Sequence, residues 1–342
     1  MKQTCSSSRA SSFRAYGFTL VEMMVALAVG GAVVAIGANA VAMIQKQTIL
    51  VARTVEVENH AKVLTEYMVS QAQGIGGGFL RPWGAVAVVE NDASGDELYL
   101  FDVDGLMECA ISSQAGQNIK LDDDSSCACL GTPSDWVGRD VIIMNKDEDE
   151  WMTATVTNAN NSSCDLTFNK GASVGNATFN GAFKSDGSWS GGGVVAVNSR
   201  RFFLNTSDDT LRMSENGGAD VIIAPDVFDL QVSMGWDGDP QDGICFQDGS
   251  ASDEWIGNHP GDPNNTADLN KPNGSATTGG LKRPANTNYK DLRQLEIGLV
   301  VGVKAGRTQP AQVLDGATKT KDKYYMRATT GRVTFRNANI YQ

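Results

Sequence analysis

The most regular hydrophobic pattern of the chain lies near its start. Between Phe18 and Ile44 Glu22 is the only ionisable side chain, and most residues are apolar. This run exceeds the ~20 residues with which a helix crosses a bilayer. Farther on, four apolar residues recur at the spacing of one helical face: Val57, Ala61, Leu64 and Met68. The pattern predicts one helix over 18–73, apolar all round in 18–44 and amphipathic in 45–73, which the following glycines end.

After these glycines the pattern changes to short segments rich in β-branched and aromatic residues, which predict strands. The predicted strands are Ala85–Val89, Glu97–Phe101, Val141–Asn145, Met152–Val156, Val194–Leu204, Phe228–Met234, Glu296–Lys304 and Arg332–Ile340. One helix followed by strands indicates the α+β class, with the helix packed on a largely antiparallel sheet in a globular domain over 79–342. Residues 236–288 are dense in Asp, Asn, Gly and Pro, which predicts a long loop or a partly disordered polar insertion.

The start of the apolar run contains a motif. Gly17-Phe18-Thr19-Leu20-Val21-Glu22 follows a leader that has basic residues and no acid. The motif resembles the processing site of type IV prepilins and pseudopilins. The resemblance implies that a prepilin peptidase removes residues 1–17 by cutting between Gly17 and Phe18, and methylates the new amino group of Phe18. It also implies that the Glu22 carboxylate neutralises the Phe18 ammonium of a neighbouring subunit, because an unpaired charge in a low-dielectric setting is far costlier than a paired one.

A secretory signal peptide is the alternative interpretation of the same residues. A positive leader precedes the run, and Ala38-Asn39-Ala40 supplies a small-residue cleavage site. The apolar region of a secretory signal is shorter, about 7–15 residues, and Glu22 would lie inside it. An uncleaved signal anchor is a third alternative. The length of the run and the place of the acid favour the prepilin interpretation.

Segments of the C-terminal half resemble the PilW-type minor pilins and the related pseudopilin J. They are Asp226–Asp237, Leu295–Val303 and Thr334–Asn337. The resemblance covers the N-terminal helix and most strands after Val194, but neither the cysteine-containing middle nor the polar insertion. It implies a minor pilin that is incorporated in, or primes assembly of, type IV pili. The alternatives are a pseudopilin J-like tip subunit of a type II secretion system and a periplasmic adhesive or binding module tethered by the helix.

The same resemblance implies the partners and the location of the protein. Its partners are the prepilin peptidase, other major and minor pilins or pseudopilins, and the inner membrane. The globular domain lies in the periplasm before assembly, and in the pilus or pseudopilus afterwards. One feature departs from the family: major pilins often have a helix-breaking proline in the membrane segment, where this chain has Gly30, Gly31, Gly37 and Asn39.

Charge gives no sign of a nucleic-acid partner. The 342-residue chain has a formal net charge of −12, which loss of a leader with Lys2, Arg9 and Arg14 would change to −15. DNA and RNA binding relies on lysine and arginine to neutralise phosphates, and no basic stripe is present. We therefore expect no nucleic-acid binding.

Five of the six cysteines follow the leader: Cys109, Cys127, Cys129, Cys164 and Cys245. In an oxidising periplasm, two disulfides and one leftover thiol are the simplest arrangement. The clustering of the first four favours pairing among them, with Cys245 left over, and the connectivity stays open. Zinc is the alternative for Cys127 and Cys129, but their separation is shorter than the usual gap between zinc ligands.

An acidic turn offers the candidate metal site. Asp237, Asp239 and Asp242 alternate with turn-forming residues, as the oxygen ligands of calcium do in short loops. The turn lacks the glutamate that completes an EF-hand loop, and a solvated acidic turn is the alternative. We expect no cofactor apart from this candidate calcium.

Little in the sequence suggests catalysis. The chain has two histidines, His60 and His259, and neither is flanked by a nucleophile motif. We therefore expect that the protein is not an enzyme. Two tryptophans in polar loops, Trp189 and Trp255, are candidates either for a partner or carbohydrate contact or for core anchors.

Overall fold

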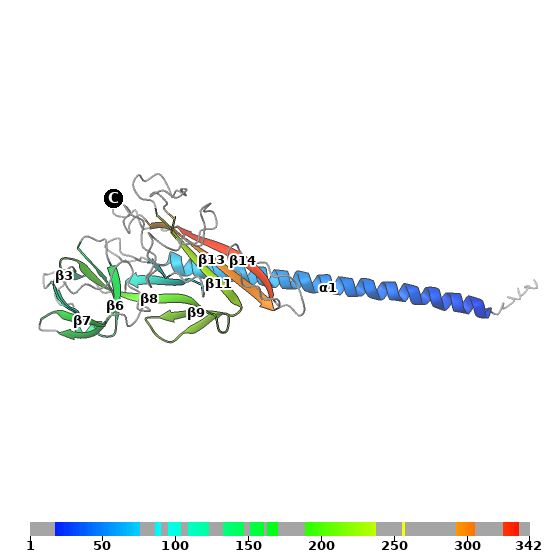
Figure 1. Ribbon diagram of the computed structural model, residues 1–342, viewed down its shortest axis with the longest axis horizontal. Coiled ribbons are helices and arrows are strands. Elements are labelled where there is room, and N and C mark those ends of the chain that lie inside the picture. The colour runs from blue at the N-terminus through cyan, green and yellow to red at the C-terminus, as the bar shows by residue number, and fades with distance from the viewer. Residues whose placement is uncertain are drawn as a thin grey trace, which may run out of the picture. The chain divides into compact units, whose positions relative to one another are not determined.

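The computed structural model describes residues 18–75, 86–89, 95–103, 109–122, 133–146, 151–160, 163–169, 189–236, 255–256, 292–304 and 324–334. The chain divides into two compact units, Met1–Thr54 and Val55–Gln342. The first unit holds the beginning of one long helix, and the second holds the end of that helix and all the described strands (Figure 1).

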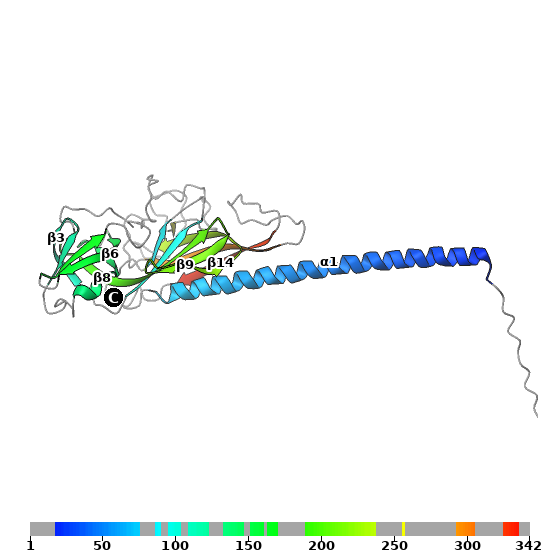
Figure 2. The same ribbon diagram turned by 90° about the horizontal axis from the view of Figure 1, so that it is seen from below.

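Helix α1 runs from Leu20 to Gln73. Every residue from Phe18 to Ile49 is exposed, so this part of the chain buries no face of its own. In the second unit the helix buries one stripe, formed by Val57, Ala61, Leu64, Thr65, Met68 and Ala72. The four stripe positions named from the sequence are all among these buried residues. Figure 2 shows this part of α1 lying alongside the strands.

The described strands form two sheets in which all neighbours are antiparallel. The larger sheet contains β1 (Val86–Val89), β2 (Glu97–Val103), β3 (Cys109–Ala115), β4 (Asn118–Leu121), β5 (Asp140–Met144), β6 (Trp151–Asn160), β7 (Asp165–Asn169), β8 (Gly193–Asn205), β9 (Thr210–Glu215) and β10 (Val221–Ala224). The smaller sheet contains β11 (Val227–Trp236), β12 (Trp255–Ile256), β13 (Leu292–Lys304) and β14 (Tyr324–Thr334), in the order β12-β11-β13-β14. The expected α+β class, a long helix followed by antiparallel sheet, is confirmed.

Strand β8 belongs to two parts of the second unit. Its first half pairs with β5 on one side and with β3 on the other. The order β8-β3-β4-β7-β6-β5, with β5 pairing back to β8, therefore closes a barrel. Its second half pairs instead with β2 and β9. Because β2 and β8 are neighbours in the sheet, the barrel strands β3–β7 form an insertion in the β2–β8 hairpin.

Each part has its own hydrophobic core. One core combines the buried stripe of α1 with apolar residues of β2, β8, β9, β11, β13 and β14. The other fills the barrel and includes Trp136 from a short 3-10 helix (η1, Pro133–Trp136), Leu166 and Trp189. Trp189 is fully buried, so of the two interpretations of this residue the core anchor is right and an exposed partner contact is wrong.

A buried carboxylate joins the two sheets. The Oδ2 atom of Asp96, immediately before β2, accepts a hydrogen bond of 2.8 Å from the backbone N–H of Val232 on β11. Its own N–H donates to the carbonyl oxygen of Leu230 at 2.8 Å. Asp96 is 1% exposed, so these bonds form out of reach of bulk water, where a hydrogen bond is electrostatically stronger.

Several strand predictions need correction. Strands β3, β4, β7, β9 and β10 were not predicted, and the last strand begins at Tyr324 rather than Arg332. In β3 and β9 only alternate or scattered positions are buried, so their apolar density is too low to stand out from a loop. The predicted insertion 236–288 also needs revision, because Trp236 belongs to β11 and Trp255–Ile256 forms β12, which pairs with β11.

Candidate functional site

The predicted processing motif lies at the start of α1. Gly17 lies outside the described residues, whereas Phe18 and Thr19 are the first that the structure describes. The helix begins at Leu20. A cut between Gly17 and Phe18 would therefore place the new amino group two residues before the first helical residue.

Glu22 and Thr19 form a capping box at this helix end. The Oε2 atom of Glu22 accepts hydrogen bonds from the backbone N–H of Thr19 at 2.9 Å and from its hydroxyl at 3.0 Å. The hydroxyl oxygen of Thr19 in turn accepts a bond of 3.3 Å from the N–H of Glu22. This reciprocal arrangement satisfies two backbone donors that a helix start otherwise leaves without partners.

The capping box changes what Glu22 can do. Within the described residues both hydrogen bonds to its carboxylate end on Oε2, which leaves Oε1 available to a cation from outside the chain. The negative charge also lies at the positive end of the helix dipole. Sequence reasoning did not identify Thr19, although the spacing Thr-x-x-Glu before an apolar run was a visible signal.

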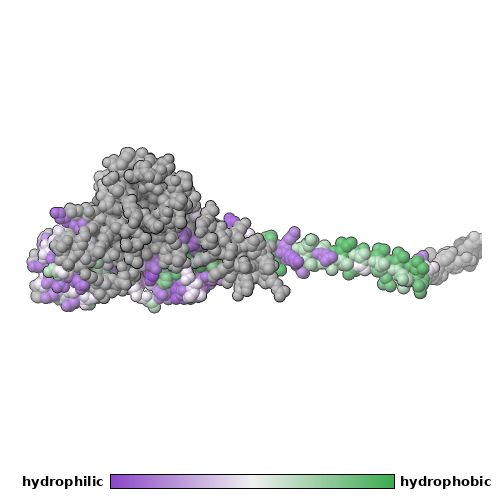
Figure 3. Space-filling model, in the orientation of Figure 1, coloured by the Kyte–Doolittle hydropathy of each residue, from purple (hydrophilic) through white to green (hydrophobic). Residues whose placement is uncertain are grey.

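The residues that follow form an apolar surface. The exposed side chains include Leu27, Val34 and Ile36, which are 74%, 71% and 69% exposed. By length and composition α1 could cross a membrane, and it is the one helix of the described residues that could. Figure 3 shows hydrophobic residues gathered along the N-terminal half of this helix.

The other predicted sites are described only in part. Cys109 and Cys164 are both disulfide-bonded, while Cys127, Cys129 and Cys245 lie outside the described residues. The candidate calcium ligands Asp237, Asp239 and Asp242 lie outside them too. Among the residues that the structure does describe, no group of three or more His, Cys, Asp or Glu could hold a metal ion.

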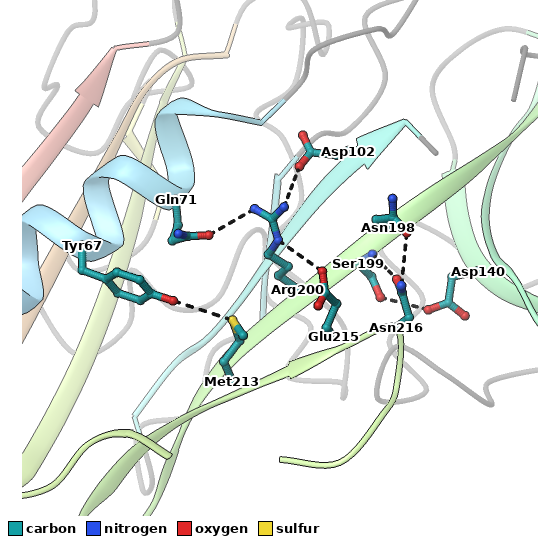
Figure 4. Close-up of polar contacts among 10 residues, drawn as sticks. All are labelled: Tyr67, Gln71, Asp102, Asp140, Asn198, Ser199, Arg200, Met213, Glu215 and Asn216. Carbon is teal, nitrogen blue, oxygen red and sulfur yellow. Dashed lines mark hydrogen bonds and ion pairs between the residues drawn. The ribbon is translucent and has the colours of Figure 1, made fainter. Parts of the chain in front are cut away.

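Arg200 on β8 ties the end of α1 to the larger sheet (Figure 4). Its Nη1 donates to Oε1 of Gln71 on α1 at 3.1 Å. Its Nη2 lies 3.4 Å from Oδ2 of Asp102 on β2, and its Nε lies 3.7 Å from Oε1 of Glu215 on β9. One guanidinium therefore contacts the helix and two strands, which its planar fork of donors allows.

A second polar group lies where β8 passes from the barrel to the rest of the sheet (Figure 4). The buried Asp140 of β5 accepts hydrogen bonds from the hydroxyls of Ser199 at 2.9 Å and Thr155 at 3.1 Å. The N–H of Ser199 donates to the side-chain oxygen of Asn216 at 2.7 Å, and the N–H of Asn216 donates to the carbonyl oxygen of Ser199 at 2.8 Å. These bonds fix the barrel to β8 and to the turn after β9.

A third set of polar side-chain contacts joins β2 to β8. Arg201 makes two hydrogen bonds to Glu97, at 2.9 Å and 2.6 Å, and its guanidinium carbon lies 4.2 Å from the ring centre of Phe203. The hydroxyl of Tyr99 donates to the same carboxylate at 2.7 Å. Burial raises the pKa of Tyr99, and the charge and hydrogen bond of Glu97 raise it further, so this hydroxyl stays protonated at physiological pH. None of these polar groups was visible in the sequence, because their members come from different strands.

Residues 12–38 match the profile of the prokaryotic N-terminal methylation motif. The match spans the predicted cut, Glu22 and the beginning of the apolar run. The start of the chain therefore carries a motif for N-terminal methylation. No curated protein matches the chain.

Among solved structures the chain is similar to the type IV-like pilin TTHA1219 from Thermus thermophilus. The comparison covers 81% of this chain and 96% of that chain, at 8% sequence identity and a TM-score of 0.32. A TM-score of this size does not establish a common fold, so the motif and the geometry of α1 are the observations on which a functional assignment rests.

Proposed function

We propose that the chain is the precursor of a minor pilin of the PilW type, which a prepilin peptidase processes and which joins, or primes, a type IV pilus. The observation that carries this proposal is the methylation motif at residues 12–38, placed at the start of a helix whose apolar half is exposed. A helix that is apolar all round is normally buried, either in a membrane or in a packed protein core. The inner membrane supplies lipid before assembly, and the filament supplies helices afterwards.

Glu22 has two partners in this proposal. Within its own chain, Oε2 accepts the two bonds from Thr19 that cap the helix. In the filament, Oε1 receives the methylated Phe18 ammonium of a neighbouring subunit. The capping bonds hold the carboxylate at the helix start, so the charge is already oriented when the neighbour arrives.

The product of this activity is an assembly and not a chemical reaction. The partners are the peptidase and other pilins, with the second unit exposed to the periplasm until the subunit enters the filament. A pseudopilin J-like role in type II secretion would use the same helix and the same carboxylate. Deleting the gene and scoring both surface pili and secreted proteins separates the two roles.

Three substitutions test the role of Glu22. Glu22→Ala removes both charge and cap, whereas Glu22→Gln removes the charge and keeps an acceptor for Thr19. The matched control is Thr19→Ala, which removes the reciprocal partner and keeps the charge. We expect both Glu22 variants to accumulate in the membrane and to be lost from sheared filaments, and Thr19→Ala to be incorporated.

Mass spectrometry of the mature amino terminus tests the processing step. The expected result is a chain that starts with N-methylated Phe18. Cleavage after Ala40 would replace this proposal with a secretory signal peptide. Normal filament incorporation of both Glu22 variants would remove the electrostatic docking step and leave the capping role alone.

A further inference from the structure

An exposed apolar pair lies on β10, at an edge of the larger sheet. Val221 is 54% exposed and Ile222 is 56% exposed. Among the described residues that follow α1, Val137 at 46% is the one other large apolar side chain that is exposed. Val221 and Ile222 are successive residues of a strand, so their side chains point to opposite faces of the sheet. Single exposed apolar residues are ordinary, but exposed apolar residues that adjoin on one face call for a covering partner.

Val221 lies one strand away from a contact between the sheet and α1. Val221 is paired with Met213 of β9, and the sulfur of Met213 lies 4.0 Å from the hydroxyl of Tyr67 on α1 (Figure 4). Directly opposite residues of an antiparallel pair point to the same face of a sheet, with Cα atoms about 5 Å apart. Val221 therefore points to the face on which α1 lies.

The helix continues this apolar surface. Val63 precedes Tyr67 by four residues, so it lies on the same side of α1, one turn earlier. Val63 is 65% exposed, whereas Tyr67 and Met213 are half-buried. Val63, Tyr67, Met213 and Val221 thus form a continuous strip, the α1–β10 strip, which is most exposed at its two ends.

The edge of β10 is poorly suited to receive another strand. The strand spans Val221–Ala224, and its pairing with β9 shifts register between Ile222 and Ala224. Pro225 follows directly and has no backbone N–H to donate. Short strands, bulges and prolines blunt a sheet edge against strand addition, so the partner must bind through side chains.

We propose that the α1–β10 strip receives the apolar half of the N-terminal helix of another pilin-type subunit. This inference rests on the proposed function, in which such helices leave the lipid and pack within a filament. The apolar half of α1 shows the kind of surface that arrives, with exposed Leu27, Val34 and Ile36. The strip begins on the helix itself, so a helix that packs against α1 reaches β10 without a break.

Crosslinking at the strip tests the identity of the partner. A photoreactive benzoyl-phenylalanine replaces Val221 in the full chain, in cells that assemble filaments, and the control carries it at Val137. We expect the probe at 221 to crosslink to a pilin-type subunit, within the apolar half of its N-terminal helix. The probe at 137 should give no such product, because Val137 follows η1 in the barrel part.

Substitutions at the same two positions test the effect on assembly. We expect Val221→Asp to lower the amount of subunit in sheared filaments by roughly tenfold, which corresponds to about 1.4 kcal/mol of docking free energy. Val137→Asp should leave that amount unchanged. Val221→Thr keeps the shape of the side chain and should give an intermediate loss, even if the aspartate variant does not fold.

The outcomes separate this inference from the proposed function. If the unsubstituted protein is processed and enters filaments, but the probe at 221 crosslinks only to lipid or to no pilin-type subunit, the strip is not a helix-docking surface. Incorporation of Val221→Asp and Val221→Thr at the level of Val137→Asp would overturn it as well. Failure of the proposed function looks different, because the unsubstituted protein would then keep its leader or never reach a filament.

Discussion

Gly331 on β14 lies directly against α1. Among the described glycines, it is the one where an added methyl group would come closest to side chains of the helix. A methyl group added at Gly331 would lie 2.6 Å from Cγ2 of Val69 and closer still to Cγ2 of Thr65. Non-bonded carbon atoms prefer separations of about 3.5–4.0 Å. The Gly331→Ala substitution therefore pushes α1 and β14 apart by about 1 Å, or forces both side chains to move.

We expect Gly331→Ala to lower the free energy of unfolding of the second unit by about 1–3 kcal/mol, as added methyl groups do in well-packed cores. The matched control is Gly298→Ala on the neighbouring strand β13, where the nearest atom to the added methyl group is the carbonyl oxygen of Gln231 at 3.6 Å. Both substitutions remove the same backbone freedom from the unfolded chain, which favours folding by about 0.5–1 kcal/mol. The difference in unfolding free energy between the two variants therefore measures the cost of the close contact with α1.

The assay is urea denaturation and a thermal melt of a fragment comprising residues 55–342, which form one compact unit. For a unit of this size each kcal/mol shifts the melting temperature by about 2–4 °C. Combining Gly331→Ala with Thr65→Ser removes one obstructing methyl group and keeps the hydroxyl that bonds Thr329 at 3.2 Å, so the pair should recover part of the loss. Equal stability of Gly331→Ala and Gly298→Ala would refute the packing argument.

Three further predictions concern the same unit. Asp96→Ala should destabilise it by about 1–3 kcal/mol, because a buried N–H of β11 loses its acceptor; a urea midpoint equal to that of the unsubstituted fragment would contradict this. Non-reducing peptide mapping should show Cys109 and Cys164 in bridges and Cys245 as a reactive thiol, whereas a bridge from Cys245 to the earlier cysteines would overturn that assignment. If the acidic turn at Asp237, Asp239 and Asp242 binds calcium, a hundredfold excess over its Kd should stabilise the fold by about 2.7 kcal/mol, and Asp239→Ala should abolish the shift; identical melts with calcium, magnesium and chelator would leave the turn as a solvated loop.

The helix was predictable because its signal is long and periodic. The buried stripe through Val57, Ala61, Leu64 and Met68 follows from spacing alone, since side chains at i, i+4 and i+7 share a face. The strands with dense apolar runs, such as β5 and β8, were predictable for a related reason. All five residues of β5 are buried, and after Asp140 its sequence is an unbroken apolar run, Val141–Met144.

The barrel was not predictable in the same way. Strands such as β3 and β9 bury only some of their residues, and their pairing depends on partners far away in the sequence. Trp189 shows the limit most clearly: its neighbours are Ser, Asp and Gly, yet it is fully buried in the barrel core. The polar neighbours of Trp189 indicate that it lies in a turn, but they do not indicate that its side chain is buried in the barrel core.

Glu22 shows a different limit. A single acid at the start of an apolar helix indicates that a partner exists, because an unpaired charge in such a setting is costly. The sequence alone does not say whether that partner lies within the chain or in a neighbour. The structure places Thr19 against one oxygen of the carboxylate, which accounts for its orientation but supplies no opposite charge. Within the described residues this neutral partner caps the helix and supplies no ion pair, so the carboxylate stays available to the cation that the proposed function assigns to a neighbouring subunit.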